Sequence, residues 1–275
     1  MKKNYTIILS LIISLCLIVA YVYVVKNDTK KNVVQSPVKT VEQTSVHEKK
    51  LADKNDFYDI EAVYPVEVKD KNSVIENFVI GKVEEKKEQW KIGGDAYNEE
   101  KKIEKDFPDR PKMQYQYSIS YKKYESRKWG TVSYVFTTYE YTGGANGNVT
   151  VNTFTFDNQG LVMIDTVLDF AINNNDITLT KMIRDKLLMR DNASKDMIND
   201  GLGLSYLKAD GKTFDQKKCN CDGFFFPSNF QNFVIEDTGL RFIFNKYQIA
   251  PGSDGLPEVV MTYDFLRSYL LPPFK

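Results

Sequence analysis

The segment Ile7–Val25 constrains this chain most, because its nineteen residues include no charged side chain. A helix needs about 20 predominantly apolar residues to cross the hydrocarbon core of a bilayer. A cleaved secretory signal is the main alternative, but its apolar region usually spans about 7–15 residues and ends in small side chains. This segment is longer and ends in Tyr21-Val22-Tyr23-Val24-Val25. We therefore expect one transmembrane helix that acts as an uncleaved signal anchor.

Lysines stand on both sides of this segment, so the distribution of positive charge does not set its orientation. Residues 1–6 are short and the part that follows the segment is long. We expect residues 1–6 to form a cytoplasmic stub and the C-terminal body to lie outside a cytoplasmic membrane that the chain crosses once. Cys16 follows the bulky Leu15 within the span, which favours a structural membrane cysteine over a lipid attachment site.

Residues 26–55 are rich in polar and charged side chains without a sustained helical or alternating period, so we expect a flexible linker. Charge is unevenly divided, because residues 1–52 carry a net charge of +5 and residues 53–275 a net charge of −5. This mildly acidic body lacks the strong basic excess of a nucleic-acid-binding domain. It is compatible with a cationic protein partner.

The single histidine of the chain, His47, lies in the expected linker. Catalytic Ser-His-Asp and Cys-His sites, and zinc sites with several imidazole ligands, are therefore excluded from the body. The sequence also lacks the glycine-rich nucleotide-binding motifs and the HExxH metalloprotease motif. We expect no cofactor, no metal site and no nucleic-acid partner.

The body combines strand and helix patterns. Ser73 and Glu76 form a capping box before apolar residues at helical spacing, which predicts a helix to Val83 with a solvated charged end at residues 84–88. Asp157–Gly160 has the residues of a hairpin turn. The expected strands are 57–69 with a break near Pro65, 113–123, 129–141, 152–156, 161–168, 233–236, 240–249 and 258–263, and further helices begin at Asp176 and Asp264. These patterns predict an α+β fold of antiparallel sheets with a few packed helices, preceded by one transmembrane helix.

The segment Tyr139–Asn148 ends an aromatic strand in a loop with three glycines. Such a loop could hold an anion with backbone N–H groups, but no helix begins there and a plain turn is favoured. Tyrosine stripes like those of residues 113–123 and 129–141 can stack on sugar rings or bases, although they more often form half-buried faces of a sheet.

Two further sets of residues could carry chemistry. Cys219 and Cys221 are expected to form a loop disulfide or to stay free thiols, because no other metal ligands accompany them. Two carboxylates suffice for a glycan hydrolase without histidine. The nominated carboxylates are Asp165, Asp169, Glu236 and Asp254, and each also has a turn or cap explanation. We expect no catalytic residue and keep a carboxylate-dependent glycan hydrolase as the alternative function.

Two stretches together resemble a known pair of extracytoplasmic modules. The stretches are Tyr139–Phe156, followed by Asp157, Gly160 and Val167–Phe170, and Gly239–Pro251, followed by Gly255 and Val259-Val260. They are similar to a PdaC-like domain, found beside a peptidoglycan deacetylase, joined to the RsiV-like domain of lysozyme-responsive anti-sigma factors. The resemblance covers about residues 57–270. It implies a PdaC-like α+β domain at residues 56–147 and an RsiV-like α+β C-terminal domain at residues 148–275.

The same resemblance implies a membrane-anchored binding module of the cell envelope that recognises lysozyme-like proteins or peptidoglycan. The residues expected to bind are Tyr139, Tyr141, Gly143, Gly144, Asn146 and Tyr247. Asn146 stands where the family usually has histidine, so no imidazole role carries over, and Gly252-Ser253 replace its usual aromatic residue. Because only six residues precede the span, we expect neither a sigma-binding segment nor anti-sigma signalling.

Overall fold

The computed structural model describes residues 47–66, 69–104, 114–143, 145–170, 175–215, 217–218 and 226–275. The expected membrane span at residues 7–25 and the expected linker up to residue 46 lie outside these residues. Among the helices of the described part, none is both long and apolar enough to cross a membrane.

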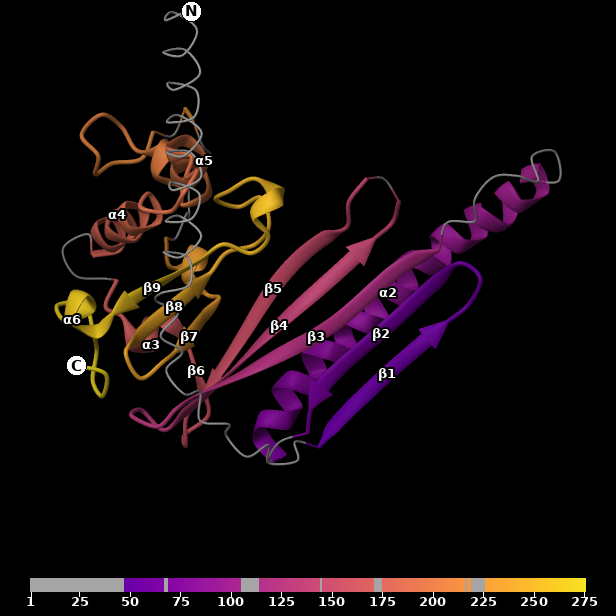
Figure 1. Cartoon of the computed structure of the whole chain (residues 1–275), viewed down its shortest axis with the longest axis horizontal. Coiled ribbons are helices and arrows are strands. Elements are labelled where there is room, and N and C mark those ends of the chain that lie inside the picture. Colours follow the sequence, from indigo (N-terminus) through magenta and orange to yellow (C-terminus); the bar gives the residue numbers. More distant parts are fainter. Residues whose placement is uncertain are drawn as a thin grey trace, which may run out of the picture. The chain divides into compact units, whose positions relative to one another are not determined.

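A six-stranded sheet organises the first half of the described body (Figure 1). Its strands lie in chain order and are β1 (Glu48–Lys54), β2 (Tyr58–Pro65), β3 (Tyr115–Ser126), β4 (Thr131–Tyr141), β5 (Asn148–Phe156) and β6 (Leu161–Val162). Neighbouring strands are antiparallel except β2 and β3, so the expectation of purely antiparallel sheets is wrong at this pair. Parallel neighbours need a crossover of about a dozen residues or more, and the helix α2 (Lys69–Glu104) supplies one.

Helix α2 is longer than the sequence predicted at both ends, because it begins at Lys69, four residues before the expected cap Ser73, and continues through residues 84–88 to Glu104. Gly93 and Gly94 weaken the local helix propensity of this extension, which hid it from pattern reading. Trp90 is buried and its ring centre lies 5.4 Å from that of Tyr115, so packing on the sheet stabilises the extension. The buried helix residues Ile75, Val79, Val83 and Trp90 share a core with alternate sheet residues, which include Ile60, Ala62, Tyr64, Tyr117, Ile119, Tyr134 and Phe136.

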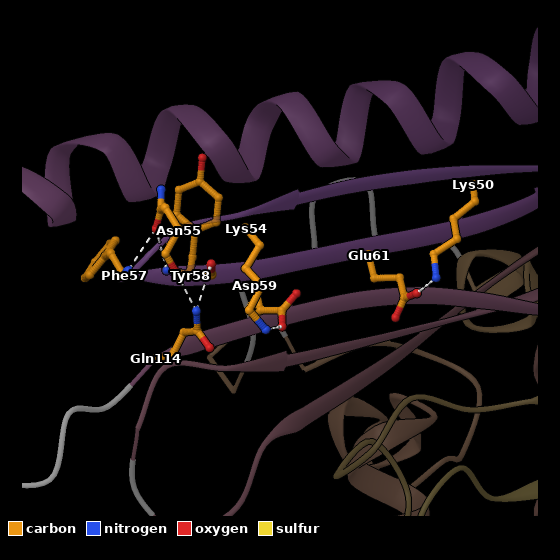
Figure 2. Close-up of polar contacts among 8 residues, drawn as sticks. All are labelled: Lys50, Lys54, Asn55, Phe57, Tyr58, Asp59, Glu61 and Gln114. Atoms are coloured by element: carbon orange, nitrogen blue, oxygen red, sulfur yellow. Dashed lines mark hydrogen bonds and ion pairs between the residues drawn. The ribbon is translucent and has the colours of Figure 1, made fainter.

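Strand β1 corrects the end of the expected linker. Residues 48–54 pair with β2 along their whole length. Ion pairs join the two strands from Lys54 to Asp59 and from Lys50 to Glu61 (Figure 2). The strand lies at the edge of the sheet and is mostly charged, so it lacks the apolar alternation that identifies strands in a sequence.

One asparagine fixes the turn after β1. The Oδ1 atom of Asn55 accepts hydrogen bonds from the backbone N–H groups of Phe57 and Tyr58, both at 2.8 Å. Gln114 Nε2 donates to the carbonyls of Asn55 at 2.5 Å and Tyr58 at 3.2 Å (Figure 2). Since Gln114 immediately precedes β3, these bonds tie the β1–β2 turn to the parallel neighbour of β2.

The second half is built on an antiparallel sheet of β7 (Phe233–Ile235), β8 (Gly239–Ile243) and β9 (Glu258–Thr262). The helices of this half are α3 (Ile164–Val167), α4 (Asn175–Leu187), α5 (Lys195–Gly201) and α6 (Tyr263–Leu266), with short 3-10 turns at η1 (Leu204–Tyr206), η2 (Phe226–Phe230) and η3 (Gly252–Asp254). Residues 161–168 were expected as one strand but divide into β6 and α3. Ile164, Val167 and Leu168 are all buried, and their separations of three and four fit a helical turn.

The two halves meet through an apolar cluster. Val135 and Val151, on the face of the six-stranded sheet opposite α2, pack with Val234 and Ile243 of the second sheet. The first sheet runs across the expected domain boundary between residues 147 and 148, because β5 pairs with β4 along nearly its whole length.

Asparagine side chains from the second half cover the outer edge of β5. The backbone N–H of Thr153 donates to Asn232 Oδ1 at 3.1 Å, and that of Val151 donates to Asn245 Oδ1 at 2.8 Å. The Thr153 hydroxyl in turn accepts the N–H of Phe233 at 2.9 Å. A buried N–H without a partner costs about 1–3 kcal/mol, so these side chains replace the partner that another strand would provide.

Asn232→Ala removes the acceptor for the Thr153 N–H. We expect the free energy of unfolding to fall by about 0.5–1.5 kcal/mol, the net contribution of a typical hydrogen bond, because the part-buried N–H loses its acceptor. Asn148→Ala is the matched control, because Asn148 is exposed and accepts from the adjacent Val149 N–H. The control should change the free energy by less than about 0.5 kcal/mol. Urea denaturation followed by circular dichroism measures both, and equal effects would contradict the role given to Asn232.

Candidate functional site

A cavity of about 370 Å³ lies where α2, the six-stranded sheet and the segment after β8 meet. Helix α2 contributes Lys82, Glu85 and Lys86, which share one face because they are three and four residues apart. The other lining residues are Tyr117 of β3, Thr138 and Glu140 of β4, Thr150, Val151 and Asn152 of β5, and Asn245. The lining residues therefore place hydroxyl, amide, ammonium and carboxylate groups around one cavity.

Lys86 joins the helix to the sheet within this wall. Its Nζ atom lies 2.6 Å from Glu140 Oε1, and the two side chains are only 11% and 31% exposed. The same ammonium lies 5.5 Å from the ring centre of Tyr117 and 5.7 Å from that of Trp90. Contact with aromatic faces and a partly shielded carboxylate holds the lysine in one position.

The protonation of the wall follows from these contacts. Burial, reinforced by the charges of Glu140 and Glu85, raises the pKa of Tyr117 to about 12. The pKa of Glu85 is lowered, mainly by the hydrogen bond that Lys82 Nζ donates at 2.9 Å. Near neutral pH the cavity thus presents a neutral phenol and an ionised Glu85 carboxylate.

The charges that line the cavity balance, since Lys82 and Lys86 oppose Glu85 and Glu140. A balanced wall gives no net attraction to a strongly charged ligand. Its hydroxyls, amides and paired ions instead offer donors and acceptors to a neutral ligand that carries many hydroxyl groups.

The segment after β8 links this cavity to the loop in which sequence reasoning placed the binding residues. Asn245 lines the cavity, and Lys246 Nζ donates to the carbonyl of Gly147 at 2.9 Å. Tyr247 is 57% exposed and has a φ of 68°. The structure therefore brings the predicted residue Tyr247 close to the predicted loop 143–147.

The predicted tyrosines of β4 face away from the cavity. Tyr139 and Tyr141 alternate with the lining residues Thr138 and Glu140, so they lie on the opposite face of the strand. The Tyr139 ring covers Gly147, where an added Cβ would lie 2.3 Å from the ring atom Cε2. Tyr139 thus packs its own loop.

Two other predicted residues are described and three are not. Asn146 is exposed, and Gly143 adopts a φ of 105° that favours glycine. Gly144, Cys219 and Cys221 lie outside the described residues.

Within the described ranges, no group of three or more His, Cys, Asp or Glu side chains is arranged to hold a metal ion. His47 is exposed at the start of β1, and its carbonyl accepts the Val66 N–H at 2.6 Å.

The carboxylates nominated for a hydrolase do not line the cavity; they are Asp165, Asp169, Glu236 and Asp254. Glu236 Oε1 lies 2.6 Å from Arg241 Nε. Asp254 lies 3.7 Å from Arg190. Two of the four therefore already form ion pairs.

Sequence reasoning missed most of the cavity. Lys82 lies inside the predicted helix, while Glu85 and Lys86 belong to the run interpreted as its solvated end. Their spacing was a usable signal. Residues three and four apart share one face of a helix, and that face would lie over the polar residues at alternate positions of a strand. Asn245 carried no such signal.

Two protein families match successive parts of the chain. Residues 51–149 match the family described as "Deacetylase PdaC", and residues 173–264 match the family described as "Protein of unknown function (DUF3298)". The chain joins a PdaC-like module to a DUF3298-like module. This order confirms the resemblance predicted from the sequence. No curated protein matches the chain.

Solved structures of DUF3298 family members are similar to the chain over most of its length. A member from Bacteroides fragilis has a TM-score of 0.51 and 17% sequence identity, over 82% of this chain and 94% of that one. A second, from Pseudomonas aeruginosa PAO1, has a TM-score of 0.48 and 14% identity, over 83% and 96%. Because the sequence identity is low, the similarity to the Bacteroides structure indicates a shared fold alone.

Tyr117→Phe should make the protein less sensitive to alkaline pH. An unfolded tyrosine ionises near pH 10, whereas Tyr117 resists ionisation in the folded state to about pH 12. Its contribution to stability is therefore complete below pH 10 and is lost as the pH rises toward 12. Urea midpoints measured from pH 9 to 12 should fall more steeply for the wild type than for Tyr117→Phe. Tyr247→Phe removes an exposed phenol as the control, and parallel wild-type and Tyr117→Phe curves would contradict the assignment.

Proposed function

We propose that this protein is a membrane-anchored, extracytoplasmic module of the cell envelope that binds the glycan of peptidoglycan without cleaving it. The charge-balanced polar cavity between α2, the sheet and Asn245 carries the proposal. Its volume of about 370 Å³ lies within the range of ligand pockets, and we assign it to a short stretch of a sugar chain.

The lining groups suit the chemistry of an amino-sugar polymer. Sugar hydroxyls both donate and accept hydrogen bonds, and the hydroxyls of Thr138 and Thr150 can do the same. The amide of Asn152 matches an acetamido group in the same two roles. The balance of charge fits neutral N-acetylated sugars better than a phosphorylated ligand.

Binding without cleavage fits the state of the carboxylates. A glycosidase needs one carboxylic acid that is still protonated at its working pH, which requires a raised pKa. The pKa of Glu85 is lowered instead, and Glu140 forms an ion pair with Lys86. Neither group is placed as a general acid.

The cellular location rests on the sequence. The uncharged segment Ile7–Val25 would hold the body at the membrane, and the resemblance to extracytoplasmic modules supports a position of that body outside. A cavity for peptidoglycan glycan is useful only on that side.

A lysozyme-like protein is the second partner that we propose to test. Tyr247 is 57% exposed beside the loop 143–147, and exposed tyrosines often anchor protein interfaces. The net charge of −5 over residues 53–275 would favour a cationic partner.

Glu85→Gln tests the glycan site. The substitution keeps the shape of the side chain and replaces a charged acceptor at the cavity by a neutral amide. We expect binding of soluble peptidoglycan fragments to the full chain to weaken by about tenfold in isothermal titration calorimetry.

Glu84→Gln is the matched control for that experiment. Glu84 is the adjacent helix residue, is 62% exposed where Glu85 is 65% exposed, and also forms an i,i+3 pair with a lysine, but it does not line the cavity. Its affinity should stay within about twofold of the wild type. Equal loss in both variants, or no binding of fragments and sacculi by the wild type, would refute the glycan proposal.

The membrane anchor makes a separate prediction. After cell fractionation the full chain should sediment with the membranes, and deletion of residues 7–25 should release it, because the apolar segment would drive insertion. Protease added outside intact spheroplasts should digest the body. A full chain that stays in the soluble fraction, or a body protected from protease, would contradict the location.

A further inference from the structure

Among the described residues, no strand pairs with the outer edge of β9. Strand β9 is the last strand of the β7-β8-β9 sheet, and β7 is the strand that lies beside the six-stranded sheet (Figure 1). Two backbone hydrogen bonds, from Tyr263 N to Thr238 O and from Phe244 N to Pro257 O, show which residues of β9 direct their backbone groups toward β8. In an antiparallel ladder alternate residues face alternate sides. Val260 and its neighbours two residues away therefore direct their backbone N–H and C=O groups to the open edge.

An apolar groove lies beside this edge. A cavity of about 220 Å³ is lined by Met182, Asp185, Lys186, Met189, Val260, Met261, Thr262 and Phe265. Met189 is 75% exposed and Phe265 is 53% exposed, although both are large and apolar. Methionine side chains adapt to partners of different shape, so the groove can receive apolar side chains of an extended segment.

The edge strands β1 and β9 of the described sheets differ in their protection. Natural edges are commonly guarded against strand addition by charged side chains, especially lysine. Strand β1 follows this rule with Lys49, Lys50 and Lys54. On β9 the edge residues Val260 and Thr262 are uncharged, and the third edge residue, Glu258, pairs with Arg241 of the neighbouring strand.

Lys186 is the cation that lines the groove, and the lining anion Asp185 has a partner of its own. Asp185 lies 2.6 Å from the preceding arginine, while Glu258 and Glu236 both pair with Arg241, at 2.5 Å and 2.6 Å. Lys186 is exposed and has no ionic partner within the described part of the chain. A ligand that places a carboxylate at this end of the groove would complement it.

We propose that β9 binds an extended, acidic-apolar segment of a partner protein by strand addition. The partner backbone pairs with the open groups of β9 at Val260. Its alternate apolar side chains enter the groove between Met189 and Phe265, and its carboxylate meets Lys186. This surface is separate from the glycan cavity and does not depend on it.

A synthetic peptide tests the proposal directly. The probe is a fluorescent, acetylated and amidated peptide in which valine alternates with threonine and one aspartate is placed near its end. Its control has the same side chains but carries N-methyl groups on alternate amides, which prevents strand pairing. Fluorescence anisotropy against the full chain in lipid nanodiscs should show binding of the probe at least about tenfold tighter than of the control.

Variants locate the site. Val260→Pro removes the outward N–H and is tolerated on an edge strand, so binding should weaken by about tenfold. Val260→Thr keeps the N–H and should stay within about twofold. Lys186→Glu and Met189→Glu should each weaken binding by about tenfold, and they carry the test if the proline variant fails to fold.

Three results would overturn the proposal. Equal binding of the N-methylated peptide would exclude strand pairing. Unchanged binding by all of the weakening variants would place the peptide elsewhere. A full chain that sediments as a dimer and becomes monomeric on Val260→Pro would show that a second copy occupies the edge.

Discussion

The outer edge of β5 is the constraint on which the rest of the structure depends. Among the described residues, β6 pairs with this edge only at Thr155 and Phe156, so alternate backbone N–H groups along the rest of β5 need another partner, and burial of unpaired groups is costly. Asn232 and Asn245 satisfy two of these groups from the second half of the body. Because hydrogen bonds demand short distances and narrow angles, this arrangement fixes the second sheet against the first. The apolar cluster around Val135 then forms in the space that those bonds define.

The cavity is a consequence of the same docking. Asn245 covers the N–H of Val151 and also lines the cavity, so one residue serves both the junction and the site. Successive residues of β4 point to opposite faces of the sheet, so Glu140 faces α2 and the cavity, while Tyr139 faces the other side. A change in how the two halves pack would therefore alter the wall of the cavity. A substitution at Asn245 would therefore change both the junction of the two halves and the wall of the cavity.

The sequence predicted what is encoded locally and missed what depends on distant contacts. Alternation identified the aromatic strands, and helical spacing identified α2 and α4, because these periods act within a few residues. The predicted caps were less accurate, since α2 begins at Lys69 and α4 at Asn175, which leaves Ser73 and Asp176 inside the helices. Strand β1 escaped because its charges hide the alternation, and the parallel pairing of β2 with β3 leaves no local mark. The site was harder still. Lys86 and Glu140 are separated by 54 positions, and Asn245 and Val151 by 94, so their contacts emerge only from the fold.

The edges of the sheets show how one physical problem receives different solutions within a single chain. At β5 side-chain amides from the second half satisfy the backbone, which makes the edge internal. At β1 lysines make addition of another strand unfavourable. At β9 neither device is present around Val260, and a groove with Met189 and Phe265 adjoins the open backbone groups. An edge without cover or lysines is prone to association, and among the described residues no strand covers β9. A partner segment that forms an added strand would provide an acceptor for each outward N–H of β9, as Asn232 and Asn245 do for β5.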